Sequence, residues 1–199
     1  MMSFKFKGVI FDLDGTLVDS RLDFSQICLD IGWPVGTPLL EQLSQLSCQQ
    51  EAARANDIIR QHELAGAAAA SWMPGAKETL LQLKQRGLPL AILTRNMREA
   101  TRLMCQRLEI PIEVILTRED CAAKPDPEGL HKIAAQWQLP TEQLVYIGDY
   151  LFDLQVAANA GMASCLYINQ HNQHFLPQAD YSFRHYAYFI DELSEKVAL

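Results

Sequence analysis

The sequence has no closely spaced pair of cysteines. Its five cysteines are odd in number and scattered along the 199 residues, at Cys28, Cys48, Cys105, Cys121 and Cys165. No two of them form a CxxC pair, so a disulfide framework is not expected. This pattern favours reduced thiols that pack as small apolar side chains in a cytoplasmic protein.

Long apolar runs and an excess of positive charge are also missing. The longest weakly polar run covers residues 64–73, far fewer than the ~20 residues that span a bilayer. The N-terminus has no apolar signal core ahead of a small-residue cleavage site, so we expect the mature protein to start there. The 24 acidic and 17 basic residues give a net charge of −7, which argues against nucleic acid and anionic membranes as partners. We therefore expect a cytoplasmic protein.

Apolar runs that are typical of strands alternate with helical patterns along most of the chain. The expected strands are residues 4–12, 88–94, 112–117, 144–148 and 164–168, with a short edge strand at 181–183. Helical spacing covers 76–86, 97–108, a segment that runs from Pro127 to Trp137, and a short segment that ends near Gly161. This alternation predicts an α/β fold, with a Rossmann-like, doubly wound parallel sheet as its core.

Residues 21–73 break this alternation, because they contain helical pieces and no convincing strand. Apolar spacing indicates three helices, at about residues 22–31, 39–46 and 52–62. We expect the chain to divide into a core of residues 1–20 and 74–199 and a small helical cap of residues 21–73. This insertion can serve as a lid over a site or as a packed structural subdomain, and composition favours neither.

The strongest functional signal is the segment DLDGTLVDS, which directly follows the first apolar strand. Asp12 and Asp14 are two residues apart, so in an extended strand their carboxylates face the same side. They lie at the carboxyl end of the strand, where α/β sheets bind ligands, and Gly15 lets the chain turn sharply there. Two carboxylates that close repel each other unless a cation or a proton compensates.

A second acidic pair, Asp149 and Asp153, follows the apolar run at residues 144–148. A helix that begins near Tyr150 brings Asp153 back toward Asp149 after one turn. Alone, the pair is also typical of a helix N-cap with an exposed partner. Together, carboxylates at two strand ends form an oxygen-rich site without His or Cys ligands, which favours Mg²⁺ as the cofactor.

Donors for a phosphate follow the other two strands of the expected core. Thr94 ends the strand at 88–94, and its hydroxyl and the backbone amides of Arg95 and Asn96 can hold an anion. Lys124 follows the strand at 112–117, in a loop that two prolines restrict. The Arg95 side chain can reach a carboxylate or phosphate of the substrate, or it can pair with a surface acid.

Other polar residues carry weaker signals. The run NQHNQH at residues 169–174 is interpreted as a solvated loop and not as a second metal site, because nothing else there supplies ligands. His62, the only histidine of the insertion, is more typical of a helix surface than of a substrate ligand. Tyr150 directly follows Asp149, where its ring can either crowd or line the entrance to the site.

The order of these motifs resembles the haloacid dehalogenase superfamily of Mg²⁺-dependent phosphohydrolases. The motifs are DLDGT, Thr94 after an apolar strand, Lys124 before a proline, and GDYLFD, so the resemblance spans nearly the whole chain from Asp12 to Asp153. The insertion resembles the helical cap of that family. The segment PGAKETLLQLKQRG at residues 74–87 is similar to the segment that follows the cap in phosphoglycolate-phosphatase-like members.

The resemblance implies a role for each motif residue. Asp12 would be the nucleophile that forms an aspartyl-phosphate, and Asp14 would be the general acid and base. Mg²⁺ would be held by Asp12, the backbone carbonyl of Asp14 and Asp149, with Asp153 either ligating or orienting. Thr94, Lys124 and backbone amides would stabilise the transferring phosphoryl group.

These residues predict a phosphoric monoester hydrolase, a Mg²⁺-dependent phosphatase acting on a small phosphorylated metabolite of the phosphoglycolate or sugar phosphate class. The acid at position 14 argues against dehalogenation, because family members that cleave carbon–halogen bonds lack it. A phosphosugar mutase of the same superfamily uses the same acid pair and remains an alternative. A non-catalytic regulatory module on this fold is disfavoured by the intact motif residues, and a receiver domain by the helical insertion.

Overall fold

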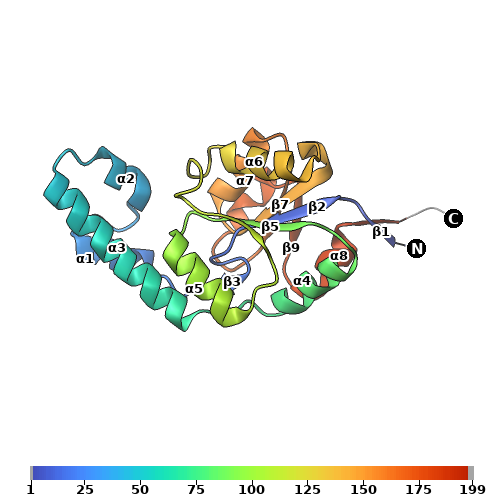
Figure 1. Cartoon of the computed structure of the whole chain (residues 1–199), viewed down its shortest axis with the longest axis horizontal. Helices are drawn as coiled ribbons and strands as arrows, with labels where there is room; N and C mark the ends of the chain where they lie inside the picture. Colours follow the sequence, from blue (N-terminus) through green and yellow to red (C-terminus); the bar gives the residue numbers. More distant parts are fainter. Residues whose placement is uncertain (1, 197–199) are drawn as a thin grey trace.

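A six-stranded parallel sheet forms the centre of the structure, a computed structural model that describes residues 2–196 (Figure 1). Across the sheet, the strands are β6 (Val114–Leu116), β5 (Leu90–Leu93), β2 (Gly8–Phe11), β7 (Leu144–Gly148), β8 (Ala163–Tyr167) and β9 (Tyr181–Phe183). Every residue of β2, β5 and β7 is buried, because helices cover both faces of the sheet. The predicted doubly wound α/β fold is confirmed.

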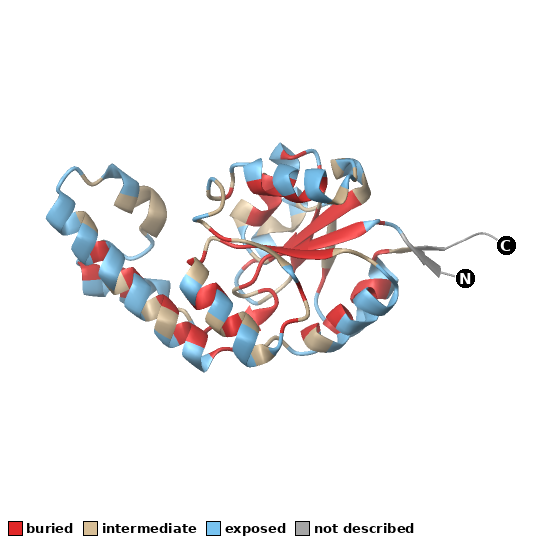
Figure 2. Cartoon of the chain, viewed as in Figure 1, coloured by how far each residue is buried: buried red, intermediate tan, exposed pale blue. Residues whose placement is uncertain are grey.

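Helices pack on both faces of this sheet, and successive residues of a strand reach opposite layers. On one face lie α6 (Glu128–Trp137) and α7 (Leu151–Asn159); on the other lie α4 (Ala76–Gln85), α5 (Arg98–Leu108) and α8 (Tyr186–Glu192). In β2, Ile10 belongs to the buried cluster of α6 and α7, whereas Phe11 belongs to the cluster of α4, α5 and α8. Figure 2 shows these buried layers on the two sides of the sheet.

The direction in which the strands are added reverses at β2. From β2 the chain first builds β5 and β6 on one side, and it then crosses back to place β7, β8 and β9 on the other. β2 therefore pairs with both β5 and β7, and the loops that leave these strands diverge at their carboxyl ends. Ligands of α/β proteins bind at such a switch point.

Three helices stand apart from the sheet: α1 (Phe24–Ile31), α2 (Leu39–Gln45) and α3 (Gln49–Ala69). They share a separate apolar cluster that is built on Ile27, Ile31, Ala55 and Ile59. The C-terminal half of α3 runs beside α5, where Ala67 joins the apolar cluster of the core. The division into a cap of residues 21–73 and a core of the remaining residues stays a prediction.

The expectation that residues 21–73 contain no strand is wrong. β4 (Ser71–Trp72) pairs antiparallel with β3 (Val18–Asp19), and this pairing brings the two ends of the insertion together. A two-residue strand is too short for an apolar period to reveal it. α3 is also longer than the helix expected at 52–62, because an alanine-rich run with high helix propensity extends it to Ala69.

The expected strand at 4–12 is divided in the structure. β1 (Met2–Phe4) pairs antiparallel with β10 (Ser194–Lys196), and β2 begins only at Gly8. Lys5 and Lys7 are exposed, since charged side chains do not enter a sheet that is buried on both faces. Two short 3₁₀ helices, η1 (Thr141–Gln143) and η2 (Gln173–Gln178), lie in loops. None of the described helices is both long and apolar enough to cross a membrane.

Candidate active site

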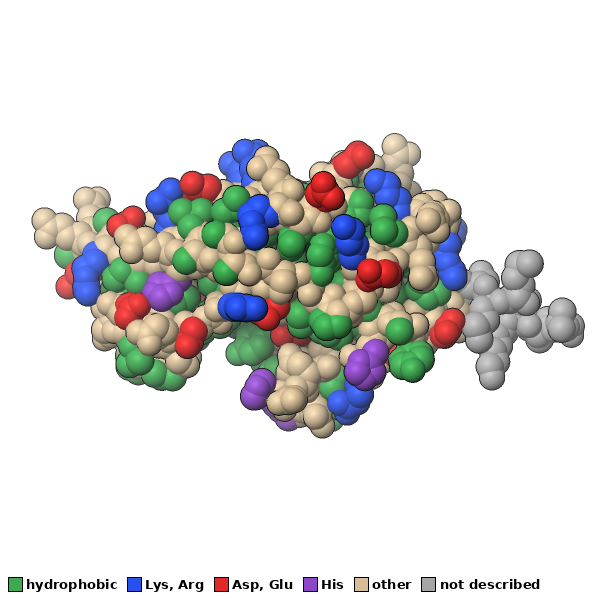
Figure 3. All heavy atoms as spheres, turned by 90° about the horizontal axis from the view of Figure 1, so that it is seen from below, with side chains coloured by type: hydrophobic (Ala, Val, Ile, Leu, Met, Phe, Trp, Pro, Cys, Tyr) green, Lys and Arg blue, Asp and Glu red, His purple; other side chains and the backbone are tan. Residues whose placement is uncertain are grey.

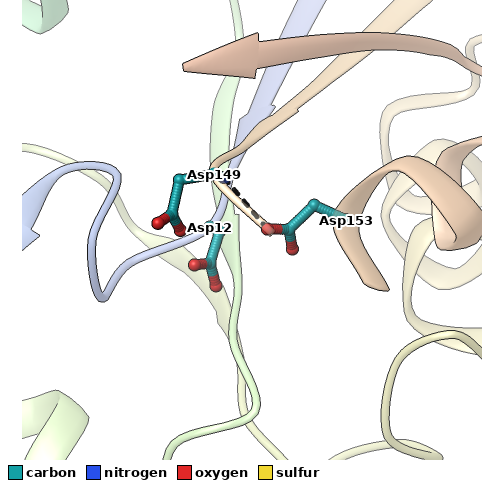
Figure 4. Close-up of side chains that lie close together, drawn as sticks. All are labelled: Asp12, Asp149 and Asp153. Atoms are coloured by element: carbon teal, nitrogen blue, oxygen red, sulfur yellow. Dashed lines mark hydrogen bonds between the residues drawn. The ribbon is translucent and has the colours of Figure 1, made fainter. Parts of the chain in front are cut away.

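Three carboxylates converge at the carboxyl ends of β2 and β7 (Figure 4). Asp12 directly follows β2, Asp149 directly follows β7, and Asp153 comes from the first turn of α7. One carboxylate oxygen of each residue lies within 4.8 Å of the others. Asp12 and Asp153 are buried, so the like charges meet where little water can screen them.

One ammonium group faces this cluster. Lys124 comes from the loop between β6 and α6, and its side chain is only 4% exposed. Nζ donates hydrogen bonds to Asp12 Oδ1 at 2.7 Å, to Asp153 Oδ1 at 2.6 Å and to Tyr146 Oη at 2.9 Å. Burial lowers the pKa of Lys124, but the two carboxylates outweigh that effect and hold the pKa above its usual value. The lysine therefore stays charged.

A single lysine does not balance three carboxylates. Burial, reinforced by Asp153, raises the pKa of Asp149 to about 7. Burial also raises the pKa of Asp12, although Lys124 opposes the shift. Both directions describe a site that lacks positive charge, which a bound cation would supply. Because the cluster offers oxygen atoms only, its residues fit the hard divalent cation that the sequence predicts.

Hydrogen bonds occupy both carboxylate oxygens of Asp153. Oδ1 accepts from Lys124, and Oδ2 accepts from the backbone N–H groups of Asp149 at 3.1 Å and Tyr150 at 2.9 Å. The second of these bonds also satisfies a donor at the N-terminus of α7. Of the two roles expected for Asp153, this geometry favours orienting Lys124 and the loop of Asp149 over binding a cation directly.

Two glycines let the carboxylates approach the backbone. Gly15 has a φ of +79°, and a Cβ built on it would lie 2.7 Å from Asp149 Oδ2. A Cβ on Gly148 would collide with the carboxyl group of Asp153. Glycine at position 15 therefore permits the expected turn and, because it has no Cβ, also leaves room for the carboxylate of Asp149.

Asp14 lies beside the cluster, and its side chain is not one of the three converging carboxylates. Its Oδ2 accepts a hydrogen bond of 2.9 Å from Asn96 Nδ2, and its Oδ1 is buried without a partner among the described residues. Burial raises the pKa of Asp14, while hydrogen bonds from Ser20 and Asn96 lower it less. β2 ends at Phe11 and the chain turns at Gly15, so the two-residue strand period does not hold between Asp12 and Asp14. A raised pKa suits a group that delivers a proton.

The loop after β5 contains the expected phosphate ligand Thr94 and forms hydrogen bonds of its own. Thr94 is buried, and its Oγ1 accepts a hydrogen bond of 3.1 Å from the backbone N–H of Asn96. That amide is therefore paired within the loop in the absence of a ligand, and the expected anion site of Thr94 and the backbone amides stays a prediction. α5 begins only at Arg98, which leaves Asn96 in the loop with its side chain directed at Asp14.

Arg95 meets an acid from the helical insertion. Its Nη2 donates to Glu41 Oε1 of α2 at 2.6 Å, and its Nη1 donates to the backbone carbonyl of Lys124 at 3.0 Å. The guanidinium group also lies over the ring of Phe152, 4.4 Å from the ring centre. Of the two alternatives for Arg95, the structure contains the pairing with an acid, but that acid comes from the segment facing the site.

Sequence reasoning missed two asparagines behind Asp149. Asn169 Nδ2 donates to Asp149 Oδ2 at 3.2 Å, and Asn172 Nδ2 donates to the backbone carbonyl of Asp149 at 2.7 Å. Asn172 is buried, so residues 169–174 are not simply the solvated loop that we expected. The available signal was a polar residue close behind the end of an apolar strand. The two histidines of this run have no part in the carboxylate cluster.

A cavity of about 1000 Å³ lies between the helical insertion and the core. Residues of α2, α3 and α5 line it, together with Arg118, Glu119 and Ala123 from the loop after β6. Asp12, Asp14 and Asp149 are not among its lining residues, so it adjoins the carboxylate cluster without containing it. In the space-filling view, the molecule is hollowed between the insertion and the core (Figure 3).

Comparison with known proteins relates this arrangement to one family. The family model described as haloacid dehalogenase-like hydrolase matches residues 9–167. The chain is 28% identical, over 174 residues, to a haloacid dehalogenase-like hydrolase domain-containing protein of Arabidopsis thaliana, with 81% of this chain and 71% of the relative covered. It is also 28% identical to a phosphoglycolate phosphatase of Vibrio cholerae, with 79% and 82% covered.

A solved structure shares the fold. A haloacid dehalogenase-like family hydrolase from Streptococcus pneumoniae superposes with a TM-score of 0.75 at 23% identity. The match covers 95% of this chain and 99% of the other. It therefore extends beyond the parallel sheet, and a likeness at this identity concerns the fold alone.

Proposed function

The chain belongs to the haloacid dehalogenase-like hydrolase family, and from this premise we propose that it is a Mg²⁺-dependent phosphatase of small phosphorylated metabolites. The observation that carries the proposal is the contact of Asp12 with Lys124, a nucleophile beside a cation at a sheet edge rich in carboxylates. The phosphoglycolate phosphatase among its relatives supports a substrate of the phosphoglycolate or sugar phosphate class. We also propose that residues 21–73 act as a cap over this site.

Asp12 is the proposed nucleophile. Its Oδ1 is held by Lys124 Nζ, so the carboxylate has a defined orientation for in-line attack on phosphorus. The attack would form an aspartyl-phosphate and release the alcohol of the substrate. Lys124 stays charged and buried, so it can also stabilise the oxygens of the transferring phosphoryl group. Mg²⁺ held by Asp12 and Asp149 would neutralise charge on the same group.

Asp14 is the proposed general acid and base. Burial raises its pKa, so it can carry the proton that the leaving alkoxide needs. Once deprotonated, it can take a proton from the water that hydrolyses the aspartyl-phosphate. Asn96 holds Oδ2 at 2.9 Å, which leaves the unpartnered Oδ1 available for both transfers.

The proposal is tested by phosphate release from phosphoglycolate and from a sugar 1-phosphate. We expect release that requires Mg²⁺, stops with chelator and is lost in Asp12→Asn. Circular dichroism of that variant checks that its fold is intact, and Asp19→Asn, an exposed acid of β3, is the matched control. Full activity of Asp12→Asn would overturn the assignment of Asp12 as the nucleophile. Turnover of the sugar phosphate only in the presence of a sugar bisphosphate would indicate a mutase instead.

A further inference from the structure

Arg95, which directly follows Thr94 in the loop after β5, forms an ion pair with Glu41 of helix α2 in the insertion. We propose that Arg95 selects substrates that carry a second acidic group, a carboxylate or phosphate, besides the phosphate that is removed. In the absence of substrate, Glu41 takes the place of that group. This inference rests on the proposed phosphatase function and narrows its substrate class.

Contacts besides the one with Glu41 hold the guanidinium group of Arg95. The backbone carbonyl of Lys124 accepts its Nη1 at 3.0 Å, and the ring of Phe152 supports the face of the guanidinium group. Two of its five N–H groups donate to described residues, so the side chain keeps donors for a ligand. Arg95 is therefore linked to both proposed phosphate ligands: it directly follows Thr94 in the chain, and its side chain donates to the backbone of Lys124. A second anion on a short substrate would therefore lie within its reach.

Glu41 is bound less completely than the arginine that holds it. Its Oε1 accepts from Arg95 at 2.6 Å, but its Oε2 is buried without a hydrogen-bond partner among the described residues. A buried carboxylate oxygen without a donor is unfavourable, because it has lost water and gained nothing in return. Exchange of Glu41 for an acidic group of the substrate would return this oxygen to water. The Glu41 side chain is 41% exposed, so it can move from Arg95 into water when an acidic group of the substrate takes its place.

A simple latch between insertion and core is the competing explanation. Two other ion pairs already join these parts: Arg60–Glu99 between α3 and α5 at 2.8 Å, and Arg118–Glu63 between the loop after β6 and α3. Arg60, Glu99 and Arg118 line the cavity beside α5, and Arg118 also donates to the backbone carbonyl of Arg95 at 3.3 Å, so the Arg60–Glu99 pair is the one without a contact to Arg95 among the described residues. Loss of a latch would change the hydrolysis of every substrate alike. Loss of a recognition residue would act only on substrates with the second acid.

The test compares 2-phosphoglycolate with ethyl phosphate, in which a methyl group replaces the carboxylate. The measured quantity is the ratio of kcat/KM for the two esters, relative to the ratio of the unaltered enzyme. We expect Arg95→Gln to lower this relative ratio about 10–100-fold, the usual effect of a lost hydrogen bond between charged groups. Glu41→Gln should raise it about 2–5-fold, because a competing charge is removed.

Arg60→Gln is the matched control, because it removes an ion pair between the same two parts of the chain. Its ratio should stay within about twofold of the unaltered enzyme. If the kcat/KM ratio of Arg95→Gln equals that of Arg60→Gln, the proposal is overturned, and the Arg95–Glu41 pair only joins the insertion to the core. A Glu41→Gln ratio that falls also overturns it, because Glu41 would then assist the acidic substrate.

A binding measurement separates this inference from the proposed function. Calorimetry with the Asp12→Asn protein reports the affinity for 2-phosphoglycolate without turnover. We expect Arg95→Gln, added to Asp12→Asn, to weaken that affinity about 10–100-fold and to leave ethyl phosphate less affected. Failure of the unaltered enzyme to hydrolyse any ester would overturn the phosphatase alone. Equal weakening for both ligands would overturn the role of Arg95.

Discussion

The side-chain amide of Asn172, in the loop after β8, donates a hydrogen bond of 2.7 Å to the backbone carbonyl of Asp149, which directly follows β7. The same nitrogen donates to the carbonyl of Tyr167 at 2.8 Å, at the end of β8. The buried Asn172 therefore bridges the ends of the neighbouring strands β7 and β8. Through this bridge, the loop after β8 holds in place a residue that we propose as a metal ligand.

Asn172→Ala is expected to weaken Mg²⁺ activation about 10–100-fold, the usual effect of losing a residue that orients a metal ligand. The reason is that the loop of Asp149 loses its anchor while the carboxylate itself remains. The measurement is the Mg²⁺ concentration for half-maximal activity, together with the thermal midpoint of unfolding. His171→Ala, an exposed side chain of the same loop, is the control. An unchanged Mg²⁺ requirement in Asn172→Ala would show that Asp149 is held without the bridge.

Asp14→Asn is expected to lower the hydrolysis of alkyl phosphates about 10²–10⁴-fold, the usual contribution of a positioned acid and base. Asparagine at position 14 keeps the shape of the aspartate and an oxygen that can accept from Asn96, but its amide cannot deliver a proton to the alkoxide. The measurement is kcat with ethyl phosphate and with p-nitrophenyl phosphate, in single-turnover and steady-state experiments. Formation of the aspartyl-phosphate from the nitrophenyl ester should be less affected, because its leaving group needs no proton. If aspartyl-phosphate formation slows equally with both esters, Asp14 is not the proton donor to the leaving group.

The carboxylates at the strand ends could be predicted because they depend on local pattern and on one general rule. The runs at 144–148 and 181–183 form strands with these bounds, since continuous apolar residues fit a sheet that is covered on both faces. Parallel strands end at the same sheet edge, so acids that directly follow them can be expected to meet. This reasoning needs only the order of strands and helices along the chain.

The remaining parts of the site depend on contacts that no local pattern contains. Arg95 and Glu41 are 54 residues apart, and their contact requires the position of α2 over the loop after β5. Asn172 looks like a solvated polar residue until the loop after β8 is placed behind Asp149. The two-residue pairing of β3 with β4 likewise arises from the closure of the insertion and not from strand propensity.

Stability should depend on pH through Asp120, which supports the loop after β6. Its carboxylate accepts from the backbone N–H of Thr117 at 2.9 Å, from Thr117 Oγ1 at 2.6 Å and from Arg98 at 2.7 Å. Burial raises the pKa of Asp120, but these hydrogen bonds together outweigh it and hold the pKa below its usual value. As the pH falls, the unfolded chain therefore takes up a proton before the folded chain does.

The stabilisation from Asp120 is thus present above about pH 3.9, the usual Asp pKa, and is lost as the pH falls through the lower pKa of the folded state. We expect Asp120→Asn to lower the free energy of unfolding most at neutral pH, and its difference from the unaltered protein to shrink toward pH 3. Urea unfolding at a series of pH values measures this difference. Asp57→Asn, at an exposed site on α3, serves as the control. A difference that grows on acidification would reverse the assigned direction.

Gly15 and Gly36 separate backbone strain from the need for space beside Asp149. Both have positive φ, +79° and +88°, but only at Gly15 would a Cβ meet Asp149 Oδ2, at 2.7 Å, since nothing lies within 4 Å at Gly36. Alanine at Gly36 should therefore destabilise the protein by about 1–2 kcal/mol and leave Mg²⁺ activation unchanged. Alanine at Gly15 should cost more stability and should also weaken Mg²⁺ activation, because Asp149 must move. Urea unfolding and Mg²⁺ titration of activity measure both effects. Equal stability and equal Mg²⁺ activation of the two variants would mean that Asp149 can move without loss of function. The close approach of Asp149 to Gly15 would then not be required by the site.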